Sequence, residues 1–359
     1  MSPRRCTAFA PGRVNVIGEH TDYNQGLALP FAIADGVTVR AAALDPTPSR
    51  PELSVEAIAA DLDEERDCFP LADPAGGDDT EGWRAYVRGS VAELAAAGRP
   101  LAPARLEISG SVPHGSGLSS SAALTVALCL ALIELGDGAE ELEPLDRVEL
   151  ARLASRVENE WAGAHTGLLD QLASLFGAAD TALCIDFQSL EVQPVPLALE
   201  GWRFAIADSG ERHAHASSGY NERRRECAAA CEQLGIASLR EASLDEVARL
   251  PEPLERRARH VLEENDRVLD AVDALQAGAI GELAGLLNAS HASLRDLYQV
   301  STPAVEATVE RLLRAGAAGA RLIGGGFGGS VLALLEPGVD LPRDSIEVLP
   351  GPGAHILTR

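Results

Sequence analysis

The most informative stretch of the chain is PHGSGLSSSAAL, which runs from Pro113 to Leu124. It follows an alternating segment, Leu106 to Val112, that predicts a strand, and it leads into an apolar run, Ala122 to Leu135, that predicts a buried helix ended by Gly136. Free backbone N–H groups and the positive end of the helix dipole make such a helix start an anion site. Its serine hydroxyls could bind phosphate oxygens or a metal, or they could simply cap an ordinary core helix.

The composition restricts the partners. The 359 residues are enough for two domains, and a hydrophobic fraction of 46% allows a sizeable core. With 54 acidic and 30 basic residues the formal net charge is -24, which argues against nucleic acid or an anionic membrane as a partner.

The longest apolar run is too short to cross a bilayer. The six cysteines show no metal or redox spacing and no signal peptide is recognisable, so we expect reduced thiols in a cytoplasmic protein.

All 30 basic residues are arginine, because the sequence contains no lysine. A Walker A loop, Schiff-base catalysis and the lysine–glutamate pair of protein kinases are therefore excluded. Any bound phosphate must be held by arginine, by backbone N–H groups and by a metal ion.

A second polar stretch lies near the N-terminus and reads GRVNVIGEHTDYN, from Gly12 to Asn24. Strand alternation places Arg13 and Asn15 on one face. Five polar side chains then fall between Glu19 and Asn24, within a segment bounded by glycines. This cluster predicts a site that grips several hydroxyl groups of a sugar, or alternatively a polar hairpin turn. The following residues, 27–44, predict strands with a turn at Asp35-Gly36.

A carboxylate, Asp170, stands inside the leucine-rich run from Gly167 to Phe176. A carboxylate in apolar surroundings costs free energy unless it is paired or functional, so Asp170 is either a structural ion-pair partner or a catalytic group. The preceding helix, predicted over Asp146 to Trp161, carries Glu158 one position away from its apolar stripe.

Three other patterns bear on the site. Trp83 begins a predicted amphipathic helix and either packs in the core or stacks on a base. The arginine triplet 223–225 predicts a solvated helix start balanced by Glu222 and Glu226. Gly324 to Gly329 matches G-x-G-x-x-G, but a short strand-like segment follows instead of a helix, so we predict a glycine turn between two strands.

Taken together, the segments 12–24, 113–123 and 324–329 resemble the galactokinases of the GHMP kinase superfamily. The N-terminal segment is the specific one, because the serine-rich loop alone is similar to the whole superfamily. The resemblance implies an α+β, two-domain GHMP kinase fold. A ribosomal-protein-S5-like domain would occupy residues 1–200 and a ferredoxin-like domain residues 201–359, with the substrates meeting between them.

The resemblance also implies a role for individual residues. Asp170 would be the catalytic aspartate and Arg13 its partner, which keeps it ionised. The residues implied in sugar binding are Glu19, His20, Asp22, Gly167 and Tyr220. Those implied in ATP binding are Gly115, Ser116, Gly117, Leu118, Ser119, Ser120 and Ser121. The implied metal ligands are Ser121 and Glu158.

The implied reaction is transfer of the γ-phosphate of ATP, with Mg²⁺, to the C1 hydroxyl of α-D-galactose. We expect a monomer whose partners are small molecules, with no nucleic acid and no membrane. One alternative is a related kinase for N-acetylgalactosamine or arabinose, because Glu211 stands where the family usually has an apolar residue. A second alternative is a non-catalytic sensor that binds galactose and ATP. Whether Asp170 acts as a base or only orients the hydroxyl is also left open.

Overall fold

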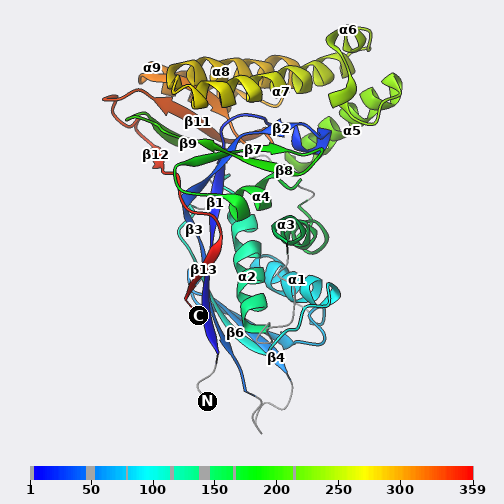
Figure 1. Ribbon diagram of the computed structural model, residues 1–359, viewed down its shortest axis with the longest axis vertical. Coiled ribbons are helices and arrows are strands. Elements are labelled where there is room, and N and C mark those ends of the chain that lie inside the picture. The colour runs from blue at the N-terminus through cyan, green and yellow to red at the C-terminus, as the bar shows by residue number, and fades with distance from the viewer. Residues whose placement is uncertain are drawn as a thin grey trace.

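The computed structural model describes residues 4–45, 53–77, 80–113, 117–136, 146–164, 167–212 and 216–358. Two of the predicted ATP-binding residues, Gly115 and Ser116, lie outside these ranges. Helices and strands are mixed in the α+β manner that the sequence predicts (Figure 1).

A six-stranded sheet forms the lower part of the molecule in Figure 1, in the order β13-β1-β3-β6-β4-β5. Its last strand in sequence pairs antiparallel with its first, so the two ends of the chain lie close together. The strands are β1 (Arg5–Asn15), β3 (Pro30–Ala43), β4 (Ser54–Ala59), β5 (Glu65–Pro70), β6 (Ala104–Gly110) and β13 (His355–Thr358).

The predicted turn at Asp35-Gly36 is wrong, because β3 continues through both residues. The pairing of β3 with β1 is irregular there: Pro11 faces Gly36, whereas Arg13 faces Ala32. A Cβ atom on Gly36 would lie 2.3 Å from the carbonyl oxygen of Ala10. The glycine therefore permits a close approach of two backbones at a bulge, and does not reverse the chain.

One face of this sheet is covered by helices, with α2 running along it in Figure 1. The predicted strand and apolar helix on either side of the serine-rich stretch are confirmed as β6 and α2, and Gly136 is the last residue of that helix. The predicted helix over 146–161 is interrupted by a π-helical turn. The elements are α1 (Trp83–Ala96), α2 (Ser120–Gly136), α3 (Arg147–Arg156), the π-helical turn Val157–Trp161 and α4 (Leu169–Phe176).

A four-stranded antiparallel sheet, in the order β10-β11-β9-β12, forms the upper part of the molecule together with the helices of the second half of the chain. The strands are β9 (Arg203–Arg212), β10 (Ala317–Leu322), β11 (Gly328–Leu335) and β12 (Ser345–Val348). The helices are α5 (Ala216–Leu234), α6 (Leu244–Val247), α7 (Leu254–Gln276), α8 (Ile280–Ser293), the π-helical turn Leu294–Tyr298 and α9 (Pro303–Arg314).

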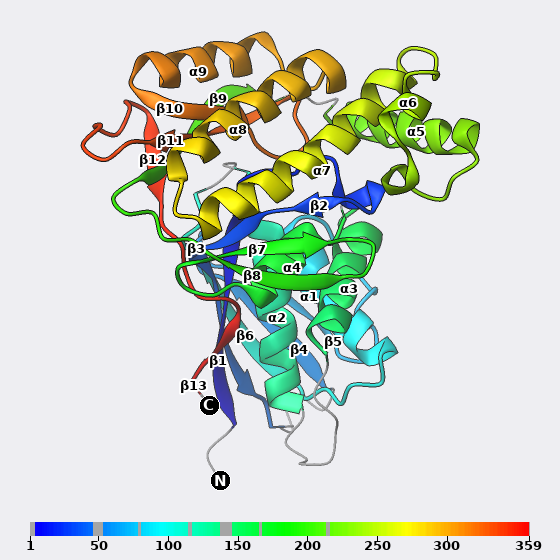
Figure 2. The same ribbon diagram turned by 45° about the horizontal axis from the view of Figure 1, so that its top comes forward.

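A small three-stranded sheet lies between these two parts, beneath α7 in Figure 2. It consists of β2 (Leu27–Ala28), β7 (Thr181–Asp186) and β8 (Glu191–Pro196). Short 3₁₀ turns cover Asp22–Asn24 and Leu239–Glu241. The glycine motif joins β10 to β11, as predicted. All six cysteines are free, and none of the described helices has the length and apolar character needed to span a membrane.

Candidate active site

A pocket of about 280 Å³ lies where the N-terminal polar cluster meets α4, α5 and the glycine turn. It brings together segments that are far apart in the sequence, because the turn between β10 and β11 reaches over the end of β1. All seven residues predicted for catalysis or sugar binding line it, together with Gly324, Gly325 and Gly326; the seven are Arg13, Glu19, His20, Asp22, Gly167, Asp170 and Tyr220.

The predicted pair of Arg13 and Asp170 is present in this pocket. Arg13, near the end of β1, directs Nε and Nη2 to Oδ1 of Asp170 at 2.8 and 2.7 Å. Its Nη1 donates to the carbonyl of Gly117 at 2.8 Å, and Ser119 donates its hydroxyl to Oδ2 of Asp170. The carboxylate is thus ionically paired, faces the pocket and is connected to the serine-rich stretch.

A second arginine–carboxylate pair was not expected from the sequence. The side chain of Arg321, in β10, is fully buried, and its Nη2 lies 2.9 Å from Oε1 of Glu19. The same oxygen accepts the N–H of Gly324 at 3.0 Å, and Arg321 Nη1 donates to the carbonyl of Val16 at 2.6 Å. The only sequence signal for this role is a lone arginine in the apolar strand just before the glycine motif.

Asp22 lines the pocket next to Gly167. A Cβ atom on Gly167 would be 2.0 Å from Oδ2 of Asp22, so a larger residue at position 167 would displace this carboxylate. Burial raises the pKa of Asp22 to about 6, and the negative charges of Asp170 and Glu19 add to the shift. Asp22 therefore takes up a proton at mildly acidic pH and is mostly ionised at neutral pH.

His20 is buried and neutral. Burial is the main cause that lowers its pKa to about 3, and the electrostatic effect of His260 is part of this shift. Its ring lies 5.3 Å from the ring of Tyr220, which α5 places against the glycine turn. Besides Asp170, the pocket therefore offers the carboxylates of Glu19 and Asp22, an imidazole and a phenol, a combination that suits a polyhydroxylated ligand.

The stretch predicted to bind phosphate adopts the backbone that a close approach of a ligand requires. Gly117 and Ser119 have φ values of 72° and 58°, and Ser120 begins α2. Leu118 packs in the core, so only its backbone is available to a ligand. The stretch is therefore shaped as a left-handed turn leading into a helix start, the arrangement that favours anions.

Ser121 and Glu158, the predicted metal ligands, face each other with their side-chain oxygens 3.4 Å apart. The other oxygen of Glu158 accepts from Nε2 of Gln171 at 2.9 Å. Burial raises the pKa of Glu158 to about 7, and the charge of Asp170 adds to it. A buried carboxylate whose hydrogen bonds come from neutral groups is a suitable ligand for a divalent cation.

No cluster of three or more histidine, cysteine or acidic residues that could hold a metal occurs in the described part of the chain. A site of one carboxylate and one hydroxyl fits Mg²⁺, which keeps waters and shares its coordination with substrate phosphates. Gln171, which holds Glu158, was missed by the sequence reasoning because nothing distinguishes it from a helix-surface glutamine.

A second cavity, of about 350 Å³, adjoins the start of α2. Trp83 and Tyr86 of α1 line it together with Ser120 and Ser121. Trp83 donates its indole N–H to Glu65 at 2.9 Å, is partly buried and packs against the hydrophobic core, which supports the packing interpretation, and it also lines this cavity, where a base could stack on it. In such an arrangement a nucleotide could place its base against the aromatic side chains and its phosphates at the anion site.

Three family models match the chain: "GHMP kinases N terminal domain" over residues 85–178, "GHMP kinases C terminal" over 271–343 and "Galactokinase galactose-binding signature" over 2–43. The last of these covers the polar cluster that builds the sugar side of the pocket.

Galactokinases are also among the most similar proteins. The galactokinase of Mycobacterium tuberculosis strain H37Rv is 43% identical over 93% of this chain and 90% of its own length, and that of Thermotoga petrophila is 39% identical over 92% and 89%. The structure of Lactococcus lactis galactokinase complexed with galactose superimposes with a TM-score of 0.86 at 33% identity, covering 98% of this chain and 95% of that one. The mevalonate kinase of Methanococcus jannaschii shares the fold, with a TM-score of 0.68 at 19% identity. This chain therefore belongs to the galactokinase family of the GHMP kinases.

Proposed function

We propose that the protein transfers the γ-phosphate of ATP to the C1 hydroxyl of α-D-galactose, giving galactose 1-phosphate and ADP. The observation that carries this proposal is the Arg13–Asp170 pair, which lies in one pocket with Glu19, His20 and Asp22 and is bonded to the serine-rich stretch. Sugar-binding groups, a reactive carboxylate and a phosphate-binding helix start thus converge on one place.

In the proposed reaction the sugar hydroxyl oxygen forms a bond to the γ-phosphorus while the bond from that phosphorus to the ADP oxygen breaks. The hydroxyl proton passes to Asp170, whose Oδ1 is held by Arg13. Alternatively, Asp170 and Arg13 only orient the hydroxyl and stabilise charge, and the proton leaves late. In both cases the residues act by position and charge, which is the main source of catalysis in phosphoryl transfer.

The triphosphate would lie along residues 117–121, where backbone N–H groups and hydroxyls substitute for the missing lysine. Ser121 and Glu158 would hold Mg²⁺, which neutralises phosphate charge when it is bound. Glu158 is 1% exposed, so a bound cation would compensate a charge that the protein otherwise buries at a cost.

The base of the nucleotide would occupy the cavity beside Trp83 and Tyr86. Trp83→Ala should raise the KM for ATP about tenfold, because base–aromatic stacking contributes about 1–3 kcal/mol, and should leave the KM for the sugar unchanged. An equal rise in both KM values would contradict this placement. Val148→Ala is a matched control, since Val148 packs on the same core outside this cavity.

Coupled ATP turnover with galactose, N-acetylgalactosamine, arabinose and glucose tests the function. Galactose should be the best substrate. A preference for N-acetylgalactosamine or arabinose would favour a related sugar kinase, and no turnover with any of the four would favour a sensor. Glu211, the residue that raised the question of specificity, bonds to Thr302 and is not among the described residues that line the pocket.

Three expectations remain predictions. They are the division of the chain near residue 200, the monomeric state and the cytoplasmic location. Analytical ultracentrifugation of the purified protein would test whether it is a monomer.

A further inference from the structure

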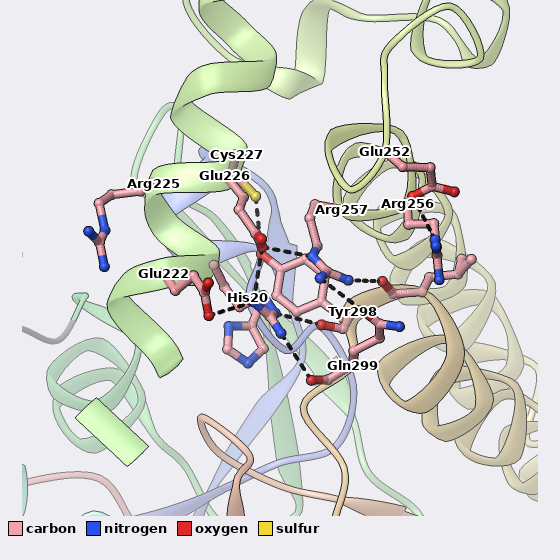
Figure 3. A network of polar contacts seen from close by, with 12 residues as sticks. His20, Glu222, Arg225, Glu226, Cys227, Glu252, Arg256, Arg257, Tyr298 and Gln299 are labelled. Carbon is pink, nitrogen blue, oxygen red and sulfur yellow. Dashed lines mark hydrogen bonds and ion pairs between the residues drawn. The ribbon is translucent and has the colours of Figure 1, made fainter. Parts of the chain in front are cut away.

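The side of His20 that faces away from the pocket begins a chain of hydrogen bonds. His20 Nδ1 lies 2.8 Å from the hydroxyl oxygen of Tyr23, and that oxygen lies 2.8 Å from the hydroxyl oxygen of Tyr298. The Tyr298 oxygen in turn lies 3.1 Å from the sulfur of Cys227. Figure 3 shows Cys227, which projects from α5, close to Tyr298 and His20.

The Tyr298 end of this chain is held rigidly. Arg223 donates Nε to the carbonyl of Tyr298 at 2.7 Å, and Arg257 donates to the carbonyl of Leu297. Glu226 lies between the two arginines, 3.0 Å from one and 2.8 Å from the other (Figure 3). The prediction of a solvated arginine triplet is thus wrong for Arg223, which is 7% exposed, although its expected partners Glu222 and Glu226 are confirmed.

Every member of the chain keeps its proton. Burial raises the pKa of Tyr23 and of Tyr298 well above its usual value, and burial raises the pKa of Cys227 to about 11. His20 is neutral, so one of its ring nitrogens carries a hydrogen and the other accepts. The four groups must therefore donate in a single direction, towards His20 or away from it.

One feature favours donation towards His20. At the near end, Glu19, Asp22 and the glycine turn line the pocket with acceptor oxygens, and the backbone of Gly325 favours a proton on the ring. His20 Nε2 is buried and makes no hydrogen bond with the described protein atoms.

We propose that Cys227, Tyr298 and Tyr23 are positioning residues that fix His20 as the Nε2–H tautomer, with Nε2 donating to a hydroxyl oxygen of the sugar. This inference rests on the proposed sugar site. The thiol donates to Tyr298, Tyr298 to Tyr23 and Tyr23 to Nδ1, so the hydrogen of the imidazole is left on Nε2. A sugar hydroxyl then provides the acceptor that this buried nitrogen lacks.

Nitrogen-15 NMR of the histidine-labelled enzyme without ligands tests the tautomer directly. The His20 resonances, identified by their loss in His20→Gln, should show a hydrogen on Nε2 and none on Nδ1. Tyr23→Phe removes the hydroxyl and keeps the ring, so the two nitrogens should shift towards an average of both tautomers. A hydrogen on Nδ1 in the wild type, or an unchanged spectrum in Tyr23→Phe, overturns the proposal.

Kinetics test whether the effect reaches the sugar. Tyr23→Phe and Tyr298→Phe should raise the KM for the sugar about five- to tenfold, as expected for one weakened hydrogen bond, with kcat and the KM for ATP nearly unchanged. Cys227→Ala should show a smaller rise and Cys227→Ser should reverse it, because serine restores a donor. Cys231→Ser, one turn along α5, is the control and should behave as wild type.

A merely structural role predicts a different pattern. It would lower thermal stability and affect both KM values together, with no change of tautomer, and this outcome also overturns the proposal. The NMR measurement requires no turnover. An enzyme that phosphorylates galactose but shows a hydrogen on Nδ1 contradicts only the positioning chain, whereas the expected tautomer in an inactive protein contradicts only the proposed function.

Discussion

Two arginine–carboxylate pairs face the same pocket but differ in burial and in what they connect. In Arg13–Asp170 the side chains are 10% and 18% exposed, and in Arg321–Glu19 they are 0% and 8% exposed. The first arginine also bonds to Gly117 in the serine-rich stretch. The second bonds to carbonyls at the end of β1, while its carboxylate also holds the glycine turn through Gly324.

The difference shows how one kind of interaction can serve two purposes. Asp170 lines the pocket and is 18% exposed, so in the proposed reaction a substrate can reach it and its pair would contribute charge. Arg321 is fully buried and bonds to the chain just after β1, so its pair would fix the wall of the proposed sugar site. A third carboxylate, Glu158, extends the comparison to a buried group that is held without an arginine. None of its hydrogen-bond donors in the described structure is an arginine.

Asp170→Asn should have the largest effect on turnover. The substitution keeps the shape of the side chain and removes its charge and basicity, so kcat should fall at least about a thousandfold while the sugar still binds. Steady-state kinetics and calorimetric titration with galactose would measure both quantities.

Asp67→Asn is the matched control for that substitution. Asp67 pairs with Arg88 through bonds of 2.7 and 2.8 Å, away from both cavities. It should lower stability and leave kcat near the wild-type value. Near-normal turnover in Asp170→Asn would remove Asp170 from the reaction and leave it as a structural partner.

Arg321→Met should have the largest effect on stability. It leaves Glu19 charged and buried without its partner, which should cost about 3–5 kcal/mol in the free energy of unfolding. Urea unfolding would measure the loss. Arg105→Met breaks an exposed pair with Glu56 and should cost less than about 1 kcal/mol. Equal losses in the two variants would show that burial does not distinguish these pairs.

Glu158→Gln should have the smallest effect, and it should be stabilising. Because the folded protein raises the pKa of Glu158 to about 7, from a usual value of about 4.5, the contribution of this group is most favourable at low pH and is lost as the pH rises through about 7. The neutral glutamine avoids this loss. Its melting temperature should exceed that of the wild type by about 2–5 °C near pH 8 and by less near pH 5.

Two measurements complete the test of Glu158. Glu149→Gln alters an exposed carboxylate on α3 and should change neither the melting temperature nor its pH dependence. Mg²⁺ with ADP should stabilise the wild type more than Glu158→Gln. A variant that is less stable than the wild type near pH 8 would show that the buried charge is already compensated within the protein.

Much of the fold and of the site follows from local patterns in the sequence. The strand, glycine turn and apolar helix around Ser119 could be predicted because strand alternation, glycine and helix capping act over a few neighbouring residues. The polar cluster from Glu19 to Asn24 stood out for a similar reason, and Glu19, His20 and Asp22 of this cluster line the pocket. The cost of an unpaired carboxylate in an apolar run likewise drew attention to Asp170.

Other features could not be predicted, because they depend on contacts between distant segments. The turn expected at Gly36 is a bulge, since only pairing with β1 reveals the close approach to Ala10. Arg223 was expected in solvent, but the carbonyls of the π-helical turn bury it. Likewise, Asp67 lies in the acidic run 61–67, a composition typical of a solvated surface, yet it is buried against Arg88.

The sequence by itself thus determined which chemistry to expect: it predicts a lysine-free phosphate site, a cluster of sugar-binding side chains and a reactive aspartate. These depend on residue type and short spacing. Only the tertiary structure decided which groups are paired, which are neutral and which carry a proton. Arg321 beneath Glu19, the raised pKa of Asp22 and the hydroxyl chain behind His20 all arise from burial and from long-range contacts, and neither of these is encoded in any one segment.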